Sequence, residues 1–384
     1  MVTRPRAEYR YWACDLTTGR KLIQVPAKPQ GPLQERLSMV SSMQFTVDLA
    51  EYENLGIDPR AIDFFGCTLP YRSMLICERQ YDGVDGSDIP WHGIITFVDG
   101  GSDSDATISA ATGGAYLDVR HVSTRTYTGQ VGETDAQILT DLVGTDAGVE
   151  GVNFILDVEG TALRDQRYQE SNRTTVLQAV NGLAKLEGGP EWTVRASWRD
   201  ENRQHVDLTF YARPRIGTTA INTVFDYPGA VRSYRDTLDF TAGHGANHII
   251  GVGSSGVASP PARDTAAITT GGYPRVEHIA QQDGADNVVE VTGLARAELA
   301  RMRRGERILS LQIDATAAPQ VYRDWWPGDD VRFTVYDADS EGRPAPSYRH
   351  PNGHTETIRV IGFDLDIASD VLVPVLWSPY AEVS

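Results

Sequence analysis

One glycine-rich segment has the spacing found at dinucleotide-binding sites. Gly251-Val252-Gly253-Ser254-Ser255-Gly256 matches G-x-G-x-x-G and follows an apolar run that predicts a strand. Binding a pyrophosphate there also needs a helix directly after the glycines, because the helix N-terminus holds the negative charge. Val257-Ala258-Ser259-Pro260-Pro261 cannot begin a helix, so the segment is interpreted as a flexible turn.

Two histidines, His244 and His248, have the spacing of a helical zinc site. Glycines lie on both sides of His244, and residues 245–247 include no carboxylate that could act as a general base. The zinc-protease arrangement cannot form from such a segment, so no metal ligands are expected here.

Pairs of carboxylates could act as acid and base in glycoside hydrolysis, on opposite sides of a sugar ring. Asp103 with Asp105, and Asp85 with Asp88, lie instead in turns at neighbouring positions, where turn-forming aspartate is the ordinary explanation. A loop beginning at Asp337 resembles the start of a calcium site, but its twelfth position is a tyrosine. These carboxylates are interpreted as solvated.

The remaining reactive side chains show no recognisable catalytic spacing. The chain has no nucleophile elbow, phosphate-binding loop or zinc-protease motif, and Cys14, Cys67 and Cys77 form no Cys-x-x-Cys pair. Six of the seven tryptophans could stack on sugars, although core positions in strands are commoner: Trp91, Trp192, Trp198, Trp325, Trp326 and Trp377. We expect no catalytic, cofactor-binding or metal-binding residues.

Charge and composition exclude further classes of protein. Lys and Arg number 35 against 52 Asp and Glu, and the net charge of −17 repels phosphate backbones and anionic lipid. No apolar run approaches the roughly 20 residues of a membrane helix, and residues 1–22 lack the apolar core of a secretory signal. With three cysteines and no disulfide framework, the chain is expected to be made in a reducing bacterial cytoplasm.

A chain of 384 residues exceeds the ~250 to 300 residues of one ordinary core, so two or three domains are expected. Residues 1–112 contain short alternating runs that predict a closed or sandwiched antiparallel sheet of five or more strands, at 9–13, 43–49, 68–79, 91–98 and 106–111. Residues 113–215 predict an α+β domain, with helices at 135–143 and 174–187. Thr134 is the expected N-cap of the first helix, and Asn172 or Thr174 that of the second. A hairpin is expected at 191–198 and 205–211.

Residues 216–384 return to a strand pattern and predict a second β domain with a loop and helix insertion at about 254–307. Strands are expected at 237–242, 247–252, 308–315, 330–336, 356–366 and 371–376. One helix is expected at 293–304, and it carries a basic cluster of Arg296, Arg301, Arg303, Arg304 and Arg307. A solvated face or salt bridges to a neighbouring acidic subunit explain these arginines better than contact with DNA.

Six phrases occur in the order found in one protein family. They are Trp12-Ala13-Cys14-Asp15-Leu16-Thr17-Thr18-Gly19-Arg20-Lys21-Leu22, Phe45-Thr46-Val47-Asp48-Leu49, Trp91-His92-Gly93-Ile94-Ile95, Tyr127-Thr128-Gly129, Gly245-Ala246-Asn247-His248-Ile249-Ile250-Gly251-Val252-Gly253 and Trp326-Pro327-Gly328-Asp329-Asp330-Val331. Together they resemble the minor tail proteins of siphophages that infect actinobacteria, which are similar to the baseplate hub or tail-associated protein of other tailed phages. The match covers nearly the whole chain.

The resemblance implies a mostly β, α+β chain with two tail-tube-like antiparallel β-barrel modules and α+β insertion domains. The first barrel then occupies residues 1–112, the α+β insertion domain 113–215 and the second barrel 216–384. The resemblance also implies a homotrimer whose six barrels continue the sixfold tail tube. Its expected partners are distal tail or tail tube proteins, the tape measure protein and tip or fibre proteins, and DNA passes through the lumen without specific binding.

The expected function is that of a structural virion protein at the tip of a long non-contractile phage tail, a baseplate hub that provides the DNA conduit during ejection. The expectation includes no enzyme activity and no cofactor, because no peptidase or lysozyme segment follows residues 379–383. One alternative is a carbohydrate-binding receptor-recognition protein of the tail tip, suggested by the tryptophans and the loop-rich stretch 337–354. Another is a tail-associated hydrolase with a site in the α+β insertion.

Overall fold

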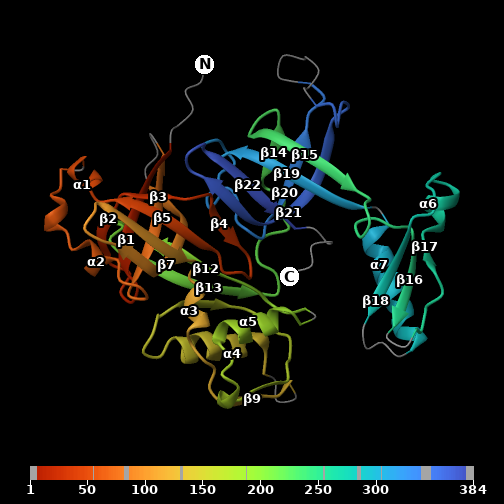
Figure 1. Cartoon of the computed structure of the whole chain (residues 1–384), viewed down its shortest axis with the longest axis horizontal. Coiled ribbons are helices and arrows are strands. Elements are labelled where there is room, and N and C mark those ends of the chain that lie inside the picture. Colours follow the sequence, from red (N-terminus) through yellow and green to blue (C-terminus); the bar gives the residue numbers. More distant parts are fainter. Residues whose placement is uncertain are drawn as a thin grey trace. The chain divides into compact units, whose positions relative to one another are not determined.

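The computed structural model describes residues 7–54, 56–81, 86–129, 133–186, 188–253, 256–282, 287–303, 305–338 and 347–377. The chain is mostly β with α+β parts, which confirms the predicted fold class (Figure 1). It divides into two compact units, Met1–Arg232 with Gln312–Val375, and Ser233–Leu311 with Leu376–Ser384.

The first sheet of the first unit has seven strands in the order β2-β1-β6-β7-β8-β5-β3, and neighbouring strands in this order are antiparallel. Its strands are β1 (Ala7–Asp15), β2 (Lys21–Val25), β3 (Ala27–Pro29), β5 (Ser42–Asp48), β6 (Ser73–Tyr81), β7 (Ser87–Gly100) and β8 (Asp105–Ala111). Short helices α1 (Glu51–Asn54), η1 (Pro59–Ala61) and α2 (Phe64–Cys67) connect β5 to β6. The five strands predicted in this region are present as β1, β5, β6, β7 and β8, although β6 begins at Ser73, five residues later than predicted.

This sheet closes on itself as a barrel. The two end strands, β2 and β3, are consecutive parts of one segment that Pro26 interrupts, and proline cannot donate to a strand ladder. The ring of Tyr11 on β1 lies 5.4 Å from that of Phe45 on β5, although three strands separate β1 from β5 in the sheet. Trp91 on β7 packs 5.3 Å from Phe45, so aromatic rings fill the interior.

The second sheet has the order β14-β20-β21-β22-β19-β15, with β4 paired to β21. Its strands are β14 (Val224–Tyr227), β15 (Val231–Asp239), β19 (Glu306–Asp314), β20 (Asp330–Val335), β21 (His354–Asp366) and β22 (Val371–Leu376). As in the first sheet, the two end strands are consecutive in the chain and a proline, Pro228, lies between them. Trp325 packs against Phe225 of β14 at 5.6 Å and against Phe363 of β21 at 6.2 Å.

The two sheets repeat one order of strands. In each sheet, the second half of the proline-interrupted segment pairs with the next strand of the same sheet, β3 with β5 and β15 with β19. The last three strands of each sheet form a meander, β6-β7-β8 and β20-β21-β22. The first sheet has one additional strand, β1, between β2 and β6. Because the second sheet has no strand in that place, β14 lies directly beside β20, and the two run parallel.

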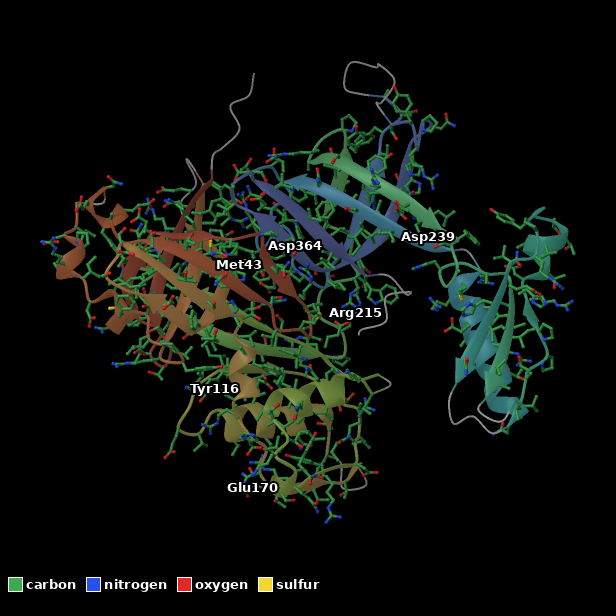
Figure 2. All side chains as sticks on the ribbon, viewed as in Figure 1. Met43, Tyr116, Glu170, Arg215, Asp239 and Asp364 are labelled. Carbon is green, nitrogen blue, oxygen red and sulfur yellow. The ribbon has the colours of Figure 1, made fainter. Side chains whose placement is uncertain are left out.

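Strand β4 (Leu33–Arg36) joins the two sheets, since it comes from the loop between β3 and β5 and pairs antiparallel with β21. Arg36 donates to Asp364 of β21 at 2.6 Å, at the position labelled in Figure 2. Leu33 and Glu35 are the buried positions of this strand. A carboxylate at an inward position conceals the alternation of apolar residues, so β4 was not predicted from the sequence.

The α+β part adds helices and a small sheet to the first unit. Its helices are α3 (Ala115–Asp118), α4 (Asp135–Thr140), the π-helical turn η3 (Asp141–Ala147), η4 (Glu170–Asn172) and α5 (Val176–Ala184). Its strands are β9 (Arg125–Tyr127) paired with β11 (Gln166–Tyr168), and β10 (Ile155–Val158), β13 (Val206–Arg213) and β12 (Glu191–Trp198) in that order. The predicted start of α4 and its N-cap, Thr134, are confirmed. The predicted hairpin is also present.

The helices share one hydrophobic core with the barrel. Cys14, Met74 and Ile76 from the barrel strands belong to the same buried cluster as Tyr116 of α3, labelled in Figure 2, and the helical residues that follow it. Trp192 of β12 lies in this cluster and stacks on Phe210 at 6.0 Å. Packing against the barrel therefore stabilises the α+β part.

Thr175 caps helix α5, whereas the sequence pointed to Asn172 or Thr174. Its hydroxyl accepts from the N–H of Gln178, and the Gln178 side chain accepts from the N–H of Thr175, which is a capping box. Replacing Thr175 by alanine should lower the free energy of unfolding by about 1 kcal/mol. Thr174→Ala is the matched control and should change it much less; equal losses in urea denaturation would contradict this assignment of the cap.

The second unit contains a three-stranded sheet covered by a helix. Strands β17 (Ala262–Arg263), β16 (His248–Gly253) and β18 (Glu277–Gln282) lie in that order, with α6 (Thr265–Thr269) and α7 (Val288–Met302). Ile249 of β16 and Ala295 of α7 belong to its small core. The predicted helix at 293–304 thus begins five residues earlier than predicted, and α6 was not predicted.

Candidate functional site

A cavity of about 190 Å³ lies in the first unit where β4, β7, β12 and the segment before β20 come together. The side chains used in the argument are Glu35, His92, Arg195, Trp198, Tyr322 and Trp326. His92 and Glu35 are buried, whereas Ser197 and Trp326 are exposed, so the cavity has a buried floor and a solvent-facing rim. Four segments far apart in the sequence therefore form one polar site.

Glu35 places a carboxyl group in the floor of the cavity, at 6% exposure. Burial raises its pKa to about 7, and the hydrogen bond from Tyr322 and the charges of Arg195 and Arg36 act in the opposite direction. The hydroxyl of Tyr322 donates to Glu35 Oε2. Tyr322 itself has φ 66°, a left-handed conformation that a tyrosine rarely adopts and that aims its ring at the carboxyl group.

Arg195 on β12 presents a guanidinium group between two aromatic rings. Its guanidinium carbon lies 4.5 Å from the centre of the Tyr211 ring and 4.6 Å from that of Trp326. Its buried Nε has no hydrogen-bond partner among the described residues. Stacking on these two rings therefore positions a cation that has several hydrogen-bond donors.

His92 on β7 places a neutral imidazole ring in the floor of the cavity. Burial lowers its pKa to about 4, so the ring is uncharged at neutral pH. The N–H of Gly113 donates to Nε2 at 3.3 Å, which assigns the ring proton to Nδ1.

A buried ion pair supports one side of the cavity. Arg79 of β6 is fully buried and makes two hydrogen bonds to Asp88 of β7, of 2.9 and 2.6 Å. It also donates to the carbonyl of Val321 at 2.8 Å, next to Tyr322. The pair therefore fixes the segment that carries Tyr322 against the barrel.

A second buried cation fixes Trp198. Lys21 Nζ lies 4.1 Å from the ring centre of Trp12 and 4.4 Å from that of Trp198, and 3.3 Å from the carboxylate of Glu78. The indole N–H of Trp198 donates to the carbonyl of Ser87 at 3.2 Å. Trp198 is consequently a rigid wall of the cavity.

The two buried titratable groups of the cavity should give opposite dependences of stability on pH. Glu35 has a folded pKa of about 7 against 4.5 unperturbed, so the folded state holds its proton more tightly and stability falls as pH rises between these values. His92 has a folded pKa of about 4 against 6.5, so stability falls as pH decreases through that window. The two effects partly cancel in the wild type.

Glu35→Gln removes one of these effects and leaves the other. The free energy of unfolding of the variant, relative to that of the wild type, should rise by roughly 3 kcal/mol between pH 4.5 and 7.5, at about 1.4 kcal/mol per pKa unit. Urea denaturation of both proteins across this range measures the difference, and parallel curves would show that Glu35 does not titrate as described.

The residues singled out in the sequence lie apart from this cavity, with a few exceptions. The glycines at 251–256 are not followed by a helix: after β16 the chain continues to β17. Gly251 is required because a Cβ there would lie 2.0 Å from the carbonyl oxygen of Val291 in α7. His248 is buried with Nδ1 3.5 Å from Glu277, and His244 Nδ1 lies 4.0 Å from Asp239.

The aspartates and tryptophans divide into different roles. Asp88 pairs with Arg79, Asp103 and Asp105 are exposed, and Asp85 lies outside the described residues. Asp337, where the calcium-like loop begins, is exposed, and residues 339–346 of that loop lie outside the described residues. Trp91, Trp192 and Trp325 are core side chains, Trp198 and Trp326 line the cavity, and Trp377 is exposed.

The predicted basic cluster is in part paired within the chain. Arg301 binds Glu298 at 2.6 Å and Arg307 binds Asp236 at 2.8 Å, whereas Arg296 and Arg303 are exposed and Arg304 lies outside the described residues. Within the part of the chain that the structure describes, no group of three or more His, Cys, Asp or Glu side chains could hold a metal ion. No helix of that part is long and apolar enough to cross a membrane.

Glu35, Arg195 and Tyr322 have no recognisable signal in the sequence. Tyr322 and Glu35 are 287 positions apart, so no local spacing relates them. The burial of Glu35 follows only from the pairing of β4 with β21, which the sequence pattern does not contain.

No protein-family model matches this chain, and no curated protein matches it. Solved structures do match over almost the whole length. The 43 kDa tail protein of prophage MuSo2 from Shewanella oneidensis is 14% identical, with a TM-score of 0.52 over 97% of this chain and 98% of that chain. The tail protein from Neisseria meningitidis MC58 is 14% identical, with a TM-score of 0.49 over 96% of this chain and 97% of that chain. The first of these shows a shared fold.

Proposed function

We propose that this chain is a structural protein of a phage tail tip, a baseplate hub that continues the tail tube and joins it to tip or fibre proteins. The observation that carries the proposal is the repeated order of strands in two sheets of one chain, each with a proline between its end strands. The fold shared with the MuSo2 tail protein over 97% of this chain supports the same role.

The symmetry of a tail tube would explain why one chain contains two similar sheets. A sixfold tube can be continued by three chains if each supplies two similar barrels, and closed rings are the usual form of such assemblies. We propose a homotrimer on this ground, with residues 1–112 and 216–384 as the barrel domains and residues 113–215 as the α+β insertion. The loop and helix insertion at about 254–307 belongs to the second barrel domain.

Exposed apolar side chains on the strands support contact with other subunits. Phe97 of β7 is 50% exposed, and Met39 before β5 is exposed to a similar extent. Large apolar side chains of this kind commonly mark protein interfaces. The proposed partners are further copies of the chain, distal tail or tail tube proteins, the tape measure protein and tip or fibre proteins.

The charge of the chain suits a conduit for DNA. A net charge of −17 repels phosphate, so DNA would pass a lumen of such subunits without being held by counterion release. The proposed location is the virion tail tip, after synthesis in the host cytoplasm. The proposed role includes neither catalysis nor a cofactor.

Light scattering after size-exclusion chromatography tests the proposed trimer. The expected mass is three times 42.1 kDa for the chain alone, and a complex formed with the tube protein of its own phage should contain three copies of the chain. Electron microscopy of tails that contain the chain should then place the ring at the tube end. A chain that stays monomeric with its tail partners present, or that lies elsewhere in the particle, would overturn the proposal.

A further inference from the structure

We propose that the cavity between β4, β7 and β12 binds one neutral sugar ring. This inference goes beyond the tail-tip role and does not depend on it. It rests on the aromatic side chains beside the cavity, on the buried Nε of Arg195, which has no partner among the described residues, and on the size of the cavity.

Two indole rings supply the apolar surface that a sugar needs. Trp198 is fixed by Lys21 and by its hydrogen bond to Ser87, as described above. Trp326 packs against Tyr322 at 4.8 Å, and its backbone N–H donates to Asp329 at 2.8 Å. Rigid aromatic rings bind the C–H face of a pyranose with little loss of side-chain entropy.

The polar groups of the cavity match hydroxyl groups. The guanidinium of Arg195 offers donors, and its Nε is buried without an acceptor among the described residues. Glu35 accepts from Tyr322 at Oε2, and its carboxyl group lines the cavity. A sugar hydroxyl both donates and accepts, so neighbouring hydroxyls of one ring can serve Glu35 and Arg195 together.

Charge and size narrow the class of ligand. When Glu35 is ionised, it and Arg195 carry opposite charges beside the same cavity, so a charged ligand of either sign would be attracted by one group and repelled by the other. The volume of about 190 Å³ is below the ~300 to 1,000 Å³ of sites for drug-sized ligands, which favours a single ring over an oligosaccharide. The exposed edge of Trp326, at 37%, leaves the ring accessible from solvent.

Isothermal titration of the full chain tests the proposal. The probes are the methyl glycosides of glucose, galactose, N-acetylglucosamine and rhamnose, with sodium acetate and tetramethylammonium chloride as charged comparisons. At least one glycoside should bind saturably and quench tryptophan fluorescence. Trp326→Ala should weaken that binding about tenfold, which is the loss of roughly 1.4 kcal/mol of stacking.

Matched variants separate binding from stability. Trp377→Ala removes another exposed tryptophan, and Arg199→Gln removes an arginine of the same hairpin that pairs with Asp207, so both should bind the glycoside as the wild type does. Ser197→Trp alters an exposed position at the rim and should block binding without disturbing the core.

Three results would overturn the inference: no saturable binding of any of the four glycosides, stronger binding of acetate or tetramethylammonium, or unchanged glycoside binding in both Trp326→Ala and Ser197→Trp. Light scattering on the Ser197→Trp variant is an independent readout. If this variant still forms the oligomer, failure of sugar binding leaves the tail-tip role standing.

Discussion

Replacing Asp88 with asparagine should lower the free energy of unfolding of the first unit by about 3–5 kcal/mol. The reason is the burial of its partner, since the Arg79 side chain is 0% exposed and donates two hydrogen bonds to this carboxylate. Asparagine has nearly the same shape as aspartate but no charge, so the buried guanidinium of Arg79 would lack a negative partner. Because an arginine side chain stays protonated, Arg79 cannot lower this desolvation penalty by becoming neutral.

The control for this prediction is an ion pair of the same residue types on the surface. Asp207→Asn breaks the contact with Arg199, whose side chain is 48% exposed, and should cost under ~1 kcal/mol. Guanidinium denaturation measures both variants. Similar losses would mean that burial does not govern the strength of the Arg79–Asp88 pair.

Replacing Trp192 with alanine should cost about 3–5 kcal/mol, because it removes one of the largest buried side chains of the chain. The ring is 1% exposed, stacks on Phe210 and donates to Asn181 at 3.0 Å. It belongs to the core that the barrel shares with the helices, so a cavity at this position weakens both. We therefore expect the barrel and the α+β part to unfold in one transition at a lower temperature.

Trp377→Ala is the matched control, since its side chain is 52% exposed, and it should change stability by less than ~0.5 kcal/mol. Thermal unfolding followed by circular dichroism and by tryptophan fluorescence tests the prediction. Two separate transitions in the Trp192→Ala protein would contradict a shared core.

Strands with regular alternation could be predicted from the sequence. The edges of β12 and β22 coincide with those expected: apolar and polar residues alternate through β12, and β22 is a short continuous apolar run. Helix α4 also begins where its N-cap predicted. In these elements local preference and tertiary packing agree, so the pattern alone identifies them.

Other elements have no such local signal. Strand β4 contains four residues with an acid at an inward position, and it is a strand only because β21 lies beside it. Strands β10 and β14 are equally short and pair in parallel with strands distant in the chain. Long-range pairing determines these elements, and a sequence window does not contain it.

The cavity shows the same limit. Each of its polar side chains has an ordinary local context: Glu35 lies among polar neighbours, Arg195 in an alternating strand and Tyr322 before two tryptophans. They line one cavity because β4 and the segment before β20 come together with β12. The tryptophan hypothesis identified Trp198 and Trp326 by residue type, but it could not separate them from Trp91, Trp192 and Trp325 in the core.

The two sheets share their order of strands, yet they differ in their additions. The first sheet contains the extra strand β1 and is followed in the chain by the α+β part, whereas the three-stranded sheet lies between β15 and β19 of the second. In a ring of three chains, unlike positions would then alternate around the circumference. A protein that recognises features common to both sheets would find six equivalent places, whereas one that recognises residues 248–302 would find three. The duplication would thus convert the stoichiometry of a hexameric tube into that of threefold appendages.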